Sequence, residues 1–206
     1  MMEYLMVAPV ASIIFALTLA TSLYAFSNES IYGKFILNPY EVSRGYRVYT
    51  IITSGLIHKD WNHLFFNMLS YYFFAFQLEA VLGHWQFGVL YFVSMILADL
   101  PSIQKHKDDT WYNTLGASGA ISAVVFSAIL FNPRGEMGLL IIPGISFPAW
   151  VFGILYLVYC HFASKHARDN INHDAHLFGA LSGILITIIL HHSVVNDFIS
   201  QFSGAN

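Results

Sequence analysis

The 206-residue chain is poor in charged residues and in cysteine. Only 10% of its residues are Asp, Glu, Lys or Arg, whereas soluble domains carry about 25%, which excludes an ordinary water-soluble domain. The formal net charge of −3 provides no positive excess for nucleic acid, so no nucleic-acid partner is expected. The single cysteine, Cys160, excludes an intrachain disulfide framework and a multi-cysteine metal site.

Apolar residues are abundant instead. They make up 56% of the chain, the mean hydropathy is +0.58, and they gather in runs near the ~20 residues that cross a bilayer. Six spans are predicted, at about residues 4–26, 61–82, 84–100, 113–131, 146–163 and 173–192. Pro101 is expected to stop the third span, and Pro148 to lie in the first turn of the fifth. The fold class is therefore all-α, a polytopic membrane protein in which residues 1–206 form one domain.

The segment between the first two predicted spans, residues 27–60, is long for a connection between packed helices. It contains four of the nine basic residues of the chain, which are Lys34, Arg44, Arg47 and Lys59. We expect this first loop to fold on the membrane surface.

The basic residues also bear on orientation. An even number of spans places both termini on one side, where the loops hold only Arg134, while the opposite loops hold the other eight Lys and Arg residues. Basic residues favour the cytoplasmic side, so this distribution alone predicts termini outside the cytoplasm.

Polar side chains open three of the predicted spans. His63 and Asn67 are four residues apart and share a helix face; His176 shares a face with Gly179 and Gly183, whose small size allows close helix approach. Ser118 lies two residues after Gly116 and directly before Gly119. Polar residues at bilayer depth are costly and are functional hypotheses by default.

A nucleophilic site explains this combination. We expect Ser118 to lie about one turn inside its helix, with Gly116 and Gly119 leaving room for a substrate backbone and the helix dipole favouring negative charge. If the His176 face packs on the fourth span, the Ser118 hydroxyl can reach the imidazole, the minimum nucleophilic unit. Each piece also has a structural interpretation, as a packing motif, a helix-capping histidine or interhelical hydrogen bonds.

Three motifs together resemble the rhomboid family of intramembrane serine proteases: HKDWNHLFFNM at 58–68, GASGAIS at 116–122 and AHLFGALSG at 175–183. The resemblance covers five of the six predicted spans and the first loop. It implies a six-helix rhomboid-like bundle that cleaves single-pass or multi-pass membrane protein substrates near the membrane surface. It implies Ser118 as nucleophile and His176 as general base, without a carboxylate, and His63 and Asn67 as oxyanion contributors beside the Ser118 N–H.

The resemblance also implies supporting residues. His58 matches a structural histidine at the foot of the first loop, and Tyr46-Arg47 is similar to a Trp-Arg pair of the family. Glu79 matches a buried glutamate that supports helix packing and the loop. Ser122 stands where rhomboids often have an aromatic residue that stacks on the catalytic imidazole.

For location, the resemblance implies a bacterial inner membrane protein with cytoplasmic termini and an active site that opens on the non-cytoplasmic side. This opposes the orientation that the basic residues predict. The resemblance is the interpretation we adopt here, and the oligomeric state stays open.

Two other functions compete. The first is a catalytically silent rhomboid-like protein that binds membrane proteins; such relatives typically lack the serine or the histidine, which this chain keeps. The second is a haem or metal protein, which ten histidines suggest, although His84, His161, His191 and His192 fall near span ends and no H-E-x-x-H motif occurs. Cys160 is interpreted as a buried apolar filler. No cofactor and no metal is therefore expected.

Overall fold

The computed structural model describes residues 2–138, 144, 146–167, 169 and 171–203. The described chain is mostly helical. Its elements are α1 (Met2–Val7), α2 (Pro9–Phe26), α3 (Glu29–Phe35), α4 (Pro39–Val42), α5 (Thr50–Thr53), the 3-10 turn η1 (Ser54–Leu56), α6 (Trp61–Leu82), α7 (His84–Lys105), α8 (Ser118–Phe131), β1 (Glu136–Gly138), β2 (Ser146–Pro148), α9 (Ala149–His166), α10 (His173–Leu190) and α11 (Val194–Ser203).

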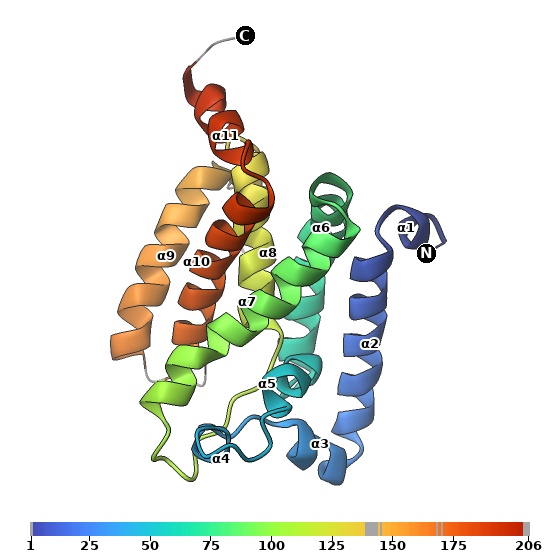
Figure 1. Ribbon diagram of the computed structural model, residues 1–206, viewed down its shortest axis with the longest axis vertical. Coiled ribbons are helices and arrows are strands. Elements are labelled where there is room, and N and C mark those ends of the chain that lie inside the picture. Colours follow the sequence, from blue (N-terminus) through green and yellow to red (C-terminus); the bar gives the residue numbers. More distant parts are fainter. Residues whose placement is uncertain (1, 139–143, 145, 168, 170, 204–206) are drawn as a thin grey trace.

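The long helices form a bundle in which α8 contacts α6, α7, α9 and α10. Figure 1 shows α2 and α9 at opposite edges of this bundle. The terminal helices α1 and α11 lie at one end, and the short helices α3 and α4 lie at the other. The first loop therefore lies at the end of the bundle opposite to the termini.

Three helices are long and apolar enough to cross a membrane: Pro9–Phe26, His84–Lys105 and His173–Leu190. The apolar helix α8 is shorter, with 14 residues. The remaining long helices, α6 and α9, have 22 and 18 residues, and polar residues such as Asn67 and Glu79 lower the hydropathy of α6. The number of six spans stays a prediction.

The boundaries of two predicted spans are wrong. The helix α7 continues past Pro101 to Lys105, because a proline removes only one helical hydrogen bond and contacts with α10 stabilise the last turn. Ser102 donates a hydrogen bond to Asn172 Oδ1 (3.0 Å), and Lys105 pairs with Asp174 (2.9 Å).

The fourth span does not begin at residue 113, since α8 starts at Ser118. Thr114 is held in an extended bridge with Leu37 by two backbone hydrogen bonds, of 3.1 and 2.9 Å. Gly116 follows with a φ of +111°, outside helical geometry. Both features exclude the helix from this segment.

Smaller differences occur at other ends. The fifth helix begins at Ala149 and continues to His166; Pro148 lies before its first turn and closes β2, which pairs with β1. The first span is interrupted at Ala8, before Pro9, as expected for a residue that precedes proline. The predicted spans contain no counterpart of α11.

Glycine allows α8 and α10 to cross closely. A Cβ at Gly179 would collide with the backbone of Gly119, and a Cβ at Gly183 would collide with the backbone of Ala123. The packing of the His176 face on the fourth span is therefore confirmed. Such contact between backbones is typical of small-residue helix interfaces in membranes.

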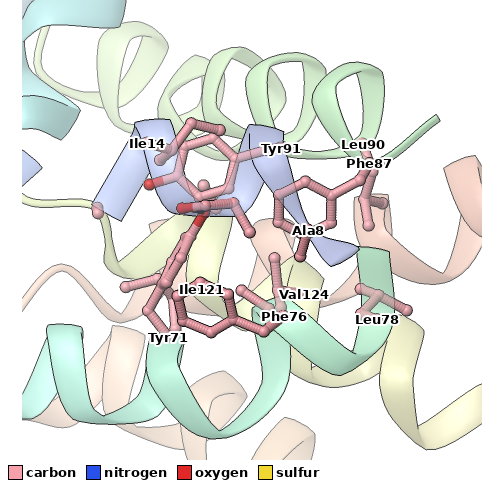
Figure 2. Close-up of a cluster of buried hydrophobic side chains, with 14 of the residues drawn as sticks. Ala8, Ile14, Tyr71, Phe76, Leu78, Phe87, Leu90, Tyr91, Ile121 and Val124 are labelled. Atoms are coloured by element: carbon pink, nitrogen blue, oxygen red, sulfur yellow. Dashed lines mark hydrogen bonds between the residues drawn. The ribbon is translucent and has the colours of Figure 1, made fainter. Parts of the chain in front are cut away.

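Aromatic and aliphatic side chains from α2, α6, α7 and α8 fill the main core (Figure 2). Tyr71 and Tyr91 are its largest fully buried side chains and meet edge to face, with ring centroids 5.7 Å apart. The Tyr71 hydroxyl donates to the carbonyl of Ala11 (3.1 Å), which ties α6 to α2.

Glu79 is fully buried and connects α6 with the start of α2. Its carboxylate accepts the backbone N–H groups of Val10 (3.1 Å) and Ala11 (2.6 Å), and the imidazole of His84 contacts it at 2.7 Å. A negative charge at a helix N-terminus is favourable. These contacts join the last turn of α6 to the first turn of α2, and the role of Glu79 in supporting the first loop stays a prediction.

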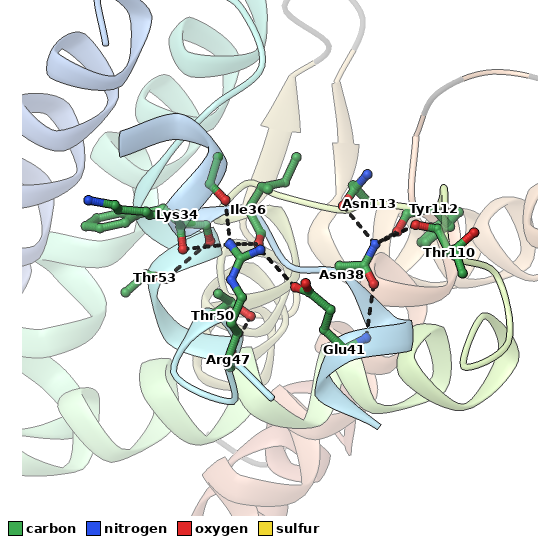
Figure 3. A network of polar contacts seen from close by, with 12 residues as sticks. Lys34, Ile36, Asn38, Glu41, Arg47, Thr50, Thr53, Thr110, Tyr112 and Asn113 are labelled. Atoms are coloured by element: carbon green, nitrogen blue, oxygen red, sulfur yellow. Dashed lines mark hydrogen bonds and ion pairs between the residues drawn. The ribbon is translucent and has the colours of Figure 1, made fainter. Parts of the chain in front are cut away.

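Arg47 holds the first loop together (Figure 3). Its guanidinium pairs with Glu41 (2.8 Å) and donates to the carbonyls of Gly33, Lys34 and Ile36. A delocalised cation with five N–H donors suits this cluster of carbonyl groups. Polar contacts within the first loop thus join its segment 33–36 to Glu41 and Arg47, and Asn38 joins the loop to residues 110–113.

Candidate active site

A cavity of about 920 Å³ lies between α6, α7, α8 and α10. The predicted residues Ser118, His176, His63 and Asn67 all line it. These residues come from three helices, and 112 residues (64–175) lie between His63 and His176 in the sequence. The structure thus brings the four predicted residues to one site.

Ser118 is the first residue of α8, so its predicted place one turn inside the helix is wrong. The first helical hydrogen bond is donated by the Ile121 N–H to the Ala117 carbonyl (2.9 Å). Ala117, the N-cap, offers no side-chain hydrogen bond. The N–H groups of the first turn are consequently left without helical partners beside the Ser118 hydroxyl.

His176 lies in the first turn of α10, which Asn172 caps by accepting the Ala175 N–H (3.0 Å). A Cβ built at Gly119 would lie 3.3 Å from the Ala175 carbonyl oxygen. The residues next to Ser118 and His176 are thus in contact across the helix interface. Both side chains are half-buried, and among the described residues no hydrogen bond joins them.

Gly116 and Gly119 line the cavity near Ser118, and the room that they leave for a substrate backbone stays a prediction. A Cβ at Gly119 would lie 2.7 Å from the Ala98 Cβ, and one at Gly116 would lie 2.5 Å from His63 Cε1. The space at these Cβ positions is filled by a neighbouring helix and by an imidazole. The glycines allow α7 and His63 to approach the start of α8.

His63 and Asn67 carry side-chain donors that the described residues leave unpaired. Asn67 is buried and its Nδ2 has no hydrogen-bond partner. The His63 backbone N–H is capped by Asp60 (2.8 Å), while its ring lies against Gly116. Both donors are available to a negatively charged oxygen in the cavity.

His58 is fully buried next to His63. Its Nδ1 contacts the Ser22 hydroxyl at 2.9 Å, and its ring meets the His63 ring edge to face, with centroids 4.9 Å apart. Burial lowers the pKa of His58 to about 3, and the neighbouring His63 adds to this effect. His58 is therefore neutral at physiological pH and connects α2 with the site.

An aromatic ring covers His176 even though Ser122 replaces the expected one. Tyr156 of α9 lies nearly parallel to the imidazole, with centroids 6.4 Å apart and an angle of 14°. Its hydroxyl forms a 2.8 Å hydrogen bond with Ser122 Oγ. The aromatic ring nearly parallel to His176 is thus supplied by α9 and not by α8.

Two further features escaped the sequence reasoning. Asp99 of α7 lines the cavity, and an acidic residue within an apolar span was a signal that could have found it. Cys160, buried as expected, places its sulfur within 4.8 Å of nitrogen atoms of His173 and His176. No sequence spacing connects Cys160 with these histidines, because it lies on a different helix.

Comparisons with known proteins agree with this architecture. The family model described as "Rhomboid domain" matches residues 45–193. "Putative rhomboid protease YdcA" of Bacillus subtilis is 32% identical over 140 residues, which cover 68% of this chain and 65% of that protein. "RHOMBOID-like protein 12, mitochondrial" of Arabidopsis thaliana is 26% identical over 166 residues, covering 71% and 49%.

A third relative, "Rhomboid protein 1, mitochondrial" of Saccharomyces cerevisiae, is 28% identical over 146 residues, which cover 66% of this chain and 40% of that protein. The chain thus spans about two fifths to two thirds of the length of these three relatives.

Proposed function

Because this chain belongs to the rhomboid family, we propose that it is an intramembrane serine endopeptidase with a Ser118–His176 dyad. The observation that carries the proposal is the shared cavity, in which a hydroxyl, an imidazole and unpaired donors from separate helices face one space. Family membership supports a polytopic membrane protein that acts on membrane proteins. The dyad is supported by the position of both residues at the starts of two helices in close contact.

In the proposed reaction, Ser118 Oγ attacks the scissile carbonyl carbon while the His176 imidazole accepts the hydroxyl proton. Collapse of the tetrahedral intermediate breaks the C–N bond, and the imidazolium returns the proton to the leaving amine. Water then attacks the acyl-enzyme ester by the same route and frees Ser118. The nearly parallel Tyr156 ring keeps the His176 imidazole oriented for both proton transfers.

The negative oxygen of the intermediate needs donors placed before the reaction begins. The unpaired N–H groups at the start of α8 and the Asn67 amide supply them, and His63 adds an imidazole N–H. Loss of one such donor costs about 10²–10³ in rate in other enzymes. Gly116 permits His63 to lie this close to Ser118.

The proposed substrates are membrane proteins cut near the membrane surface. A helix whose carbonyl groups are all hydrogen-bonded cannot present one to a nucleophile, so cleavage is expected next to small or helix-breaking residues. We propose an orientation in which the end that carries the first loop faces the non-cytoplasmic side, with α1 and α11 at the cytoplasmic end.

Labelling with a fluorophosphonate tests the nucleophile directly. The probe is expected to modify Ser118 in the purified chain, and peptide mass spectrometry locates the adduct. Labelling should vanish in Ser118→Ala and fall at least about tenfold in His176→Ala, because the hydroxyl loses its base.

The matched control is Ser122→Ala, which removes a hydroxyl one turn further along α8. This variant should remain labelled at Ser118. Equal labelling of the wild type and Ser118→Ala would reject the nucleophile and favour a rhomboid-like protein that binds membrane proteins without cutting them.

Tyr156 offers a separate test of imidazole positioning. Tyr156→Leu removes the ring that lies over His176 and is expected to lower kcat about tenfold, with a smaller change in KM. Tyr156→Phe keeps the ring and loses only the bond to Ser122, so its kcat should stay within about threefold, the effect of one neutral hydrogen bond. Equal losses in both variants would contradict a role for the ring.

A further inference from the structure

Three side chains with metal-binding atoms meet beside the proposed base. Cys160 projects from α9, and His173 and His176 lie one turn apart on α10. One donor atom from each lies within 4.8 Å of the others. A tetrahedral zinc ion, with Zn–S near 2.3 Å and Zn–N near 2.0 Å, separates its ligand atoms by about 3.3–3.6 Å. Adjustments of about 1 Å in the side chains bring the three atoms to that spacing.

His173 is buried and contacts a carboxylate through one ring nitrogen. It is 96% buried, since its exposed fraction is 4%. Its Nε2 lies 3.2 Å from both carboxylate oxygens of Asp169, and its Nδ1 is buried with no hydrogen-bond partner among the described residues. An imidazole that donates its Nε2 proton to a carboxylate carries a lone pair on Nδ1.

In metal sites, a carboxylate commonly accepts the N–H of a ligating histidine and fixes its tautomer, and Asp169 contacts His173 in this way. The Asp169 carboxylate also accepts the Ile171 N–H (3.0 Å), which holds it beside the His173 ring. A buried, unpaired lone pair is otherwise costly, and a cation would satisfy it.

The remaining two ligands complete a donor set of one sulfur and two nitrogens. The Cys160 thiol is fully buried, and His176 borders the cavity, which provides a path for ions. Thiolate and imidazole are ligands that Zn²⁺ prefers, and three protein ligands leave the fourth position to water.

We propose that Cys160, His173 and His176 form a Zn²⁺ site. Binding replaces the thiol proton of Cys160 by the metal, and this proton leaves to the solvent. The site links α9 to α10 through a metal ion. It also uses the imidazole lone pair that the proposed dyad requires.

Zinc is consequently an inhibitor of the proposed protease, a consequence that rests on the proposed function. An imidazole whose lone pair binds a metal cannot accept the Ser118 proton. Removal of the metal restores the base, so the inhibition is reversible.

Cobalt spectroscopy tests the site without any assay of proteolysis. Co²⁺ is titrated into the chelator-treated, detergent-purified full chain, and a thiolate-to-cobalt charge-transfer band is expected to saturate at one equivalent. Because the chain has one cysteine, this band reports Cys160 alone. Zn²⁺ should displace Co²⁺ and remove the band, and Ser118→Ala should bind Co²⁺ like the wild type.

The ligand variants sharpen this test. Cys160→Ser should lose the band, and His173→Asn should weaken cobalt binding at least about tenfold. The control His161→Asn removes an exposed imidazole next to Cys160 in sequence and should bind normally. If the wild type shows no band, or if His173→Asn binds Co²⁺ with wild-type affinity, the proposed metal site is wrong.

Inhibition is measured as the ratio of fluorophosphonate labelling rates in chelator and in Zn²⁺. This ratio should be about ten or more in the wild type and near one in Cys160→Ser. If the wild type shows the cobalt band but its ratio of labelling rates is near one, the metal site is supported and the inhibition by Zn²⁺ is contradicted. A cobalt band together with no labelling in either buffer means failure of the proposed function.

Discussion

Replacing His176 with alanine is expected to lower the rate of substrate cleavage by about 10³-fold or more, and Ser118→Ala is expected to do the same. Groups that act as one unit lose most of their joint effect when either is removed. The double variant Ser118→Ala/His176→Ala should therefore cleave no more slowly than either single variant. Residual activity would come from binding and from the oxyanion donors alone.

The measurement is single-turnover cleavage of a membrane-spanning substrate in liposomes that also contain the full chain. His161→Asn serves as the matched histidine control, because His161 is exposed and its imidazole contacts Lys165 of its own helix at 3.1 Å. This variant should cleave the substrate at the wild-type rate. A double variant whose loss equals the product of the two single losses would show that the residues act independently, which contradicts a dyad.

The sequence predicted the architecture well where apolar runs and small residues carry the information. The resemblance to rhomboids is confirmed by the family match. The second predicted span coincides with α6, Trp61–Leu82, and the spacing of Gly179 and Gly183 predicted the face of α10 that packs on α8. These features depend on local periodicity, which one sequence displays directly.

The start of α8 could not be predicted, because it depends on a partner distant in sequence. Thr114 is held extended by Leu37, a residue of the first loop, so the apolar pattern alone extended the helix too far. This difference matters for the proposed chemistry: it moves Ser118 from inside a helix to its uncapped first turn.

The surroundings of His176 were likewise beyond sequence reasoning. Tyr156 and Cys160 are four residues apart on α9, and both lie near His176 only because α9 packs on α10. Ser122 stands where rhomboids often have a stacking aromatic residue, and its hydroxyl forms a hydrogen bond with the Tyr156 hydroxyl. Such contacts depend on how the helices pack against each other, which cannot be predicted from a single sequence.

The close crossing of α8 and α10 leaves no room for a Cβ at Gly179. In Gly179→Ala, the new methyl group would lie 2.8 Å from the Gly119 carbonyl carbon and 3.0 Å from its Cα. Both atoms belong to backbone, so relief requires the helices to separate. Overpacking costs about 1–3 kcal/mol, occasionally more, and we expect about 3 kcal/mol, a fall in Tm of about 6–12 °C for a chain of this size.

Separation of the helices should also impair catalysis, since Ser118 and His176 lie one and three residues from the contact. A displacement of about 1 Å between reacting groups can cost about 10² in rate, so cleavage in Gly179→Ala should fall about that far at temperatures where the protein remains folded. Gly88→Ala is the matched control, because its methyl group would meet only Val10 Cγ1, at 3.7 Å. It should keep both Tm and rate. A Gly179→Ala variant with wild-type Tm and rate would show that the helices tolerate a wider crossing, and the close contact of α8 with α10 would no longer explain how the hydroxyl and the imidazole are held together.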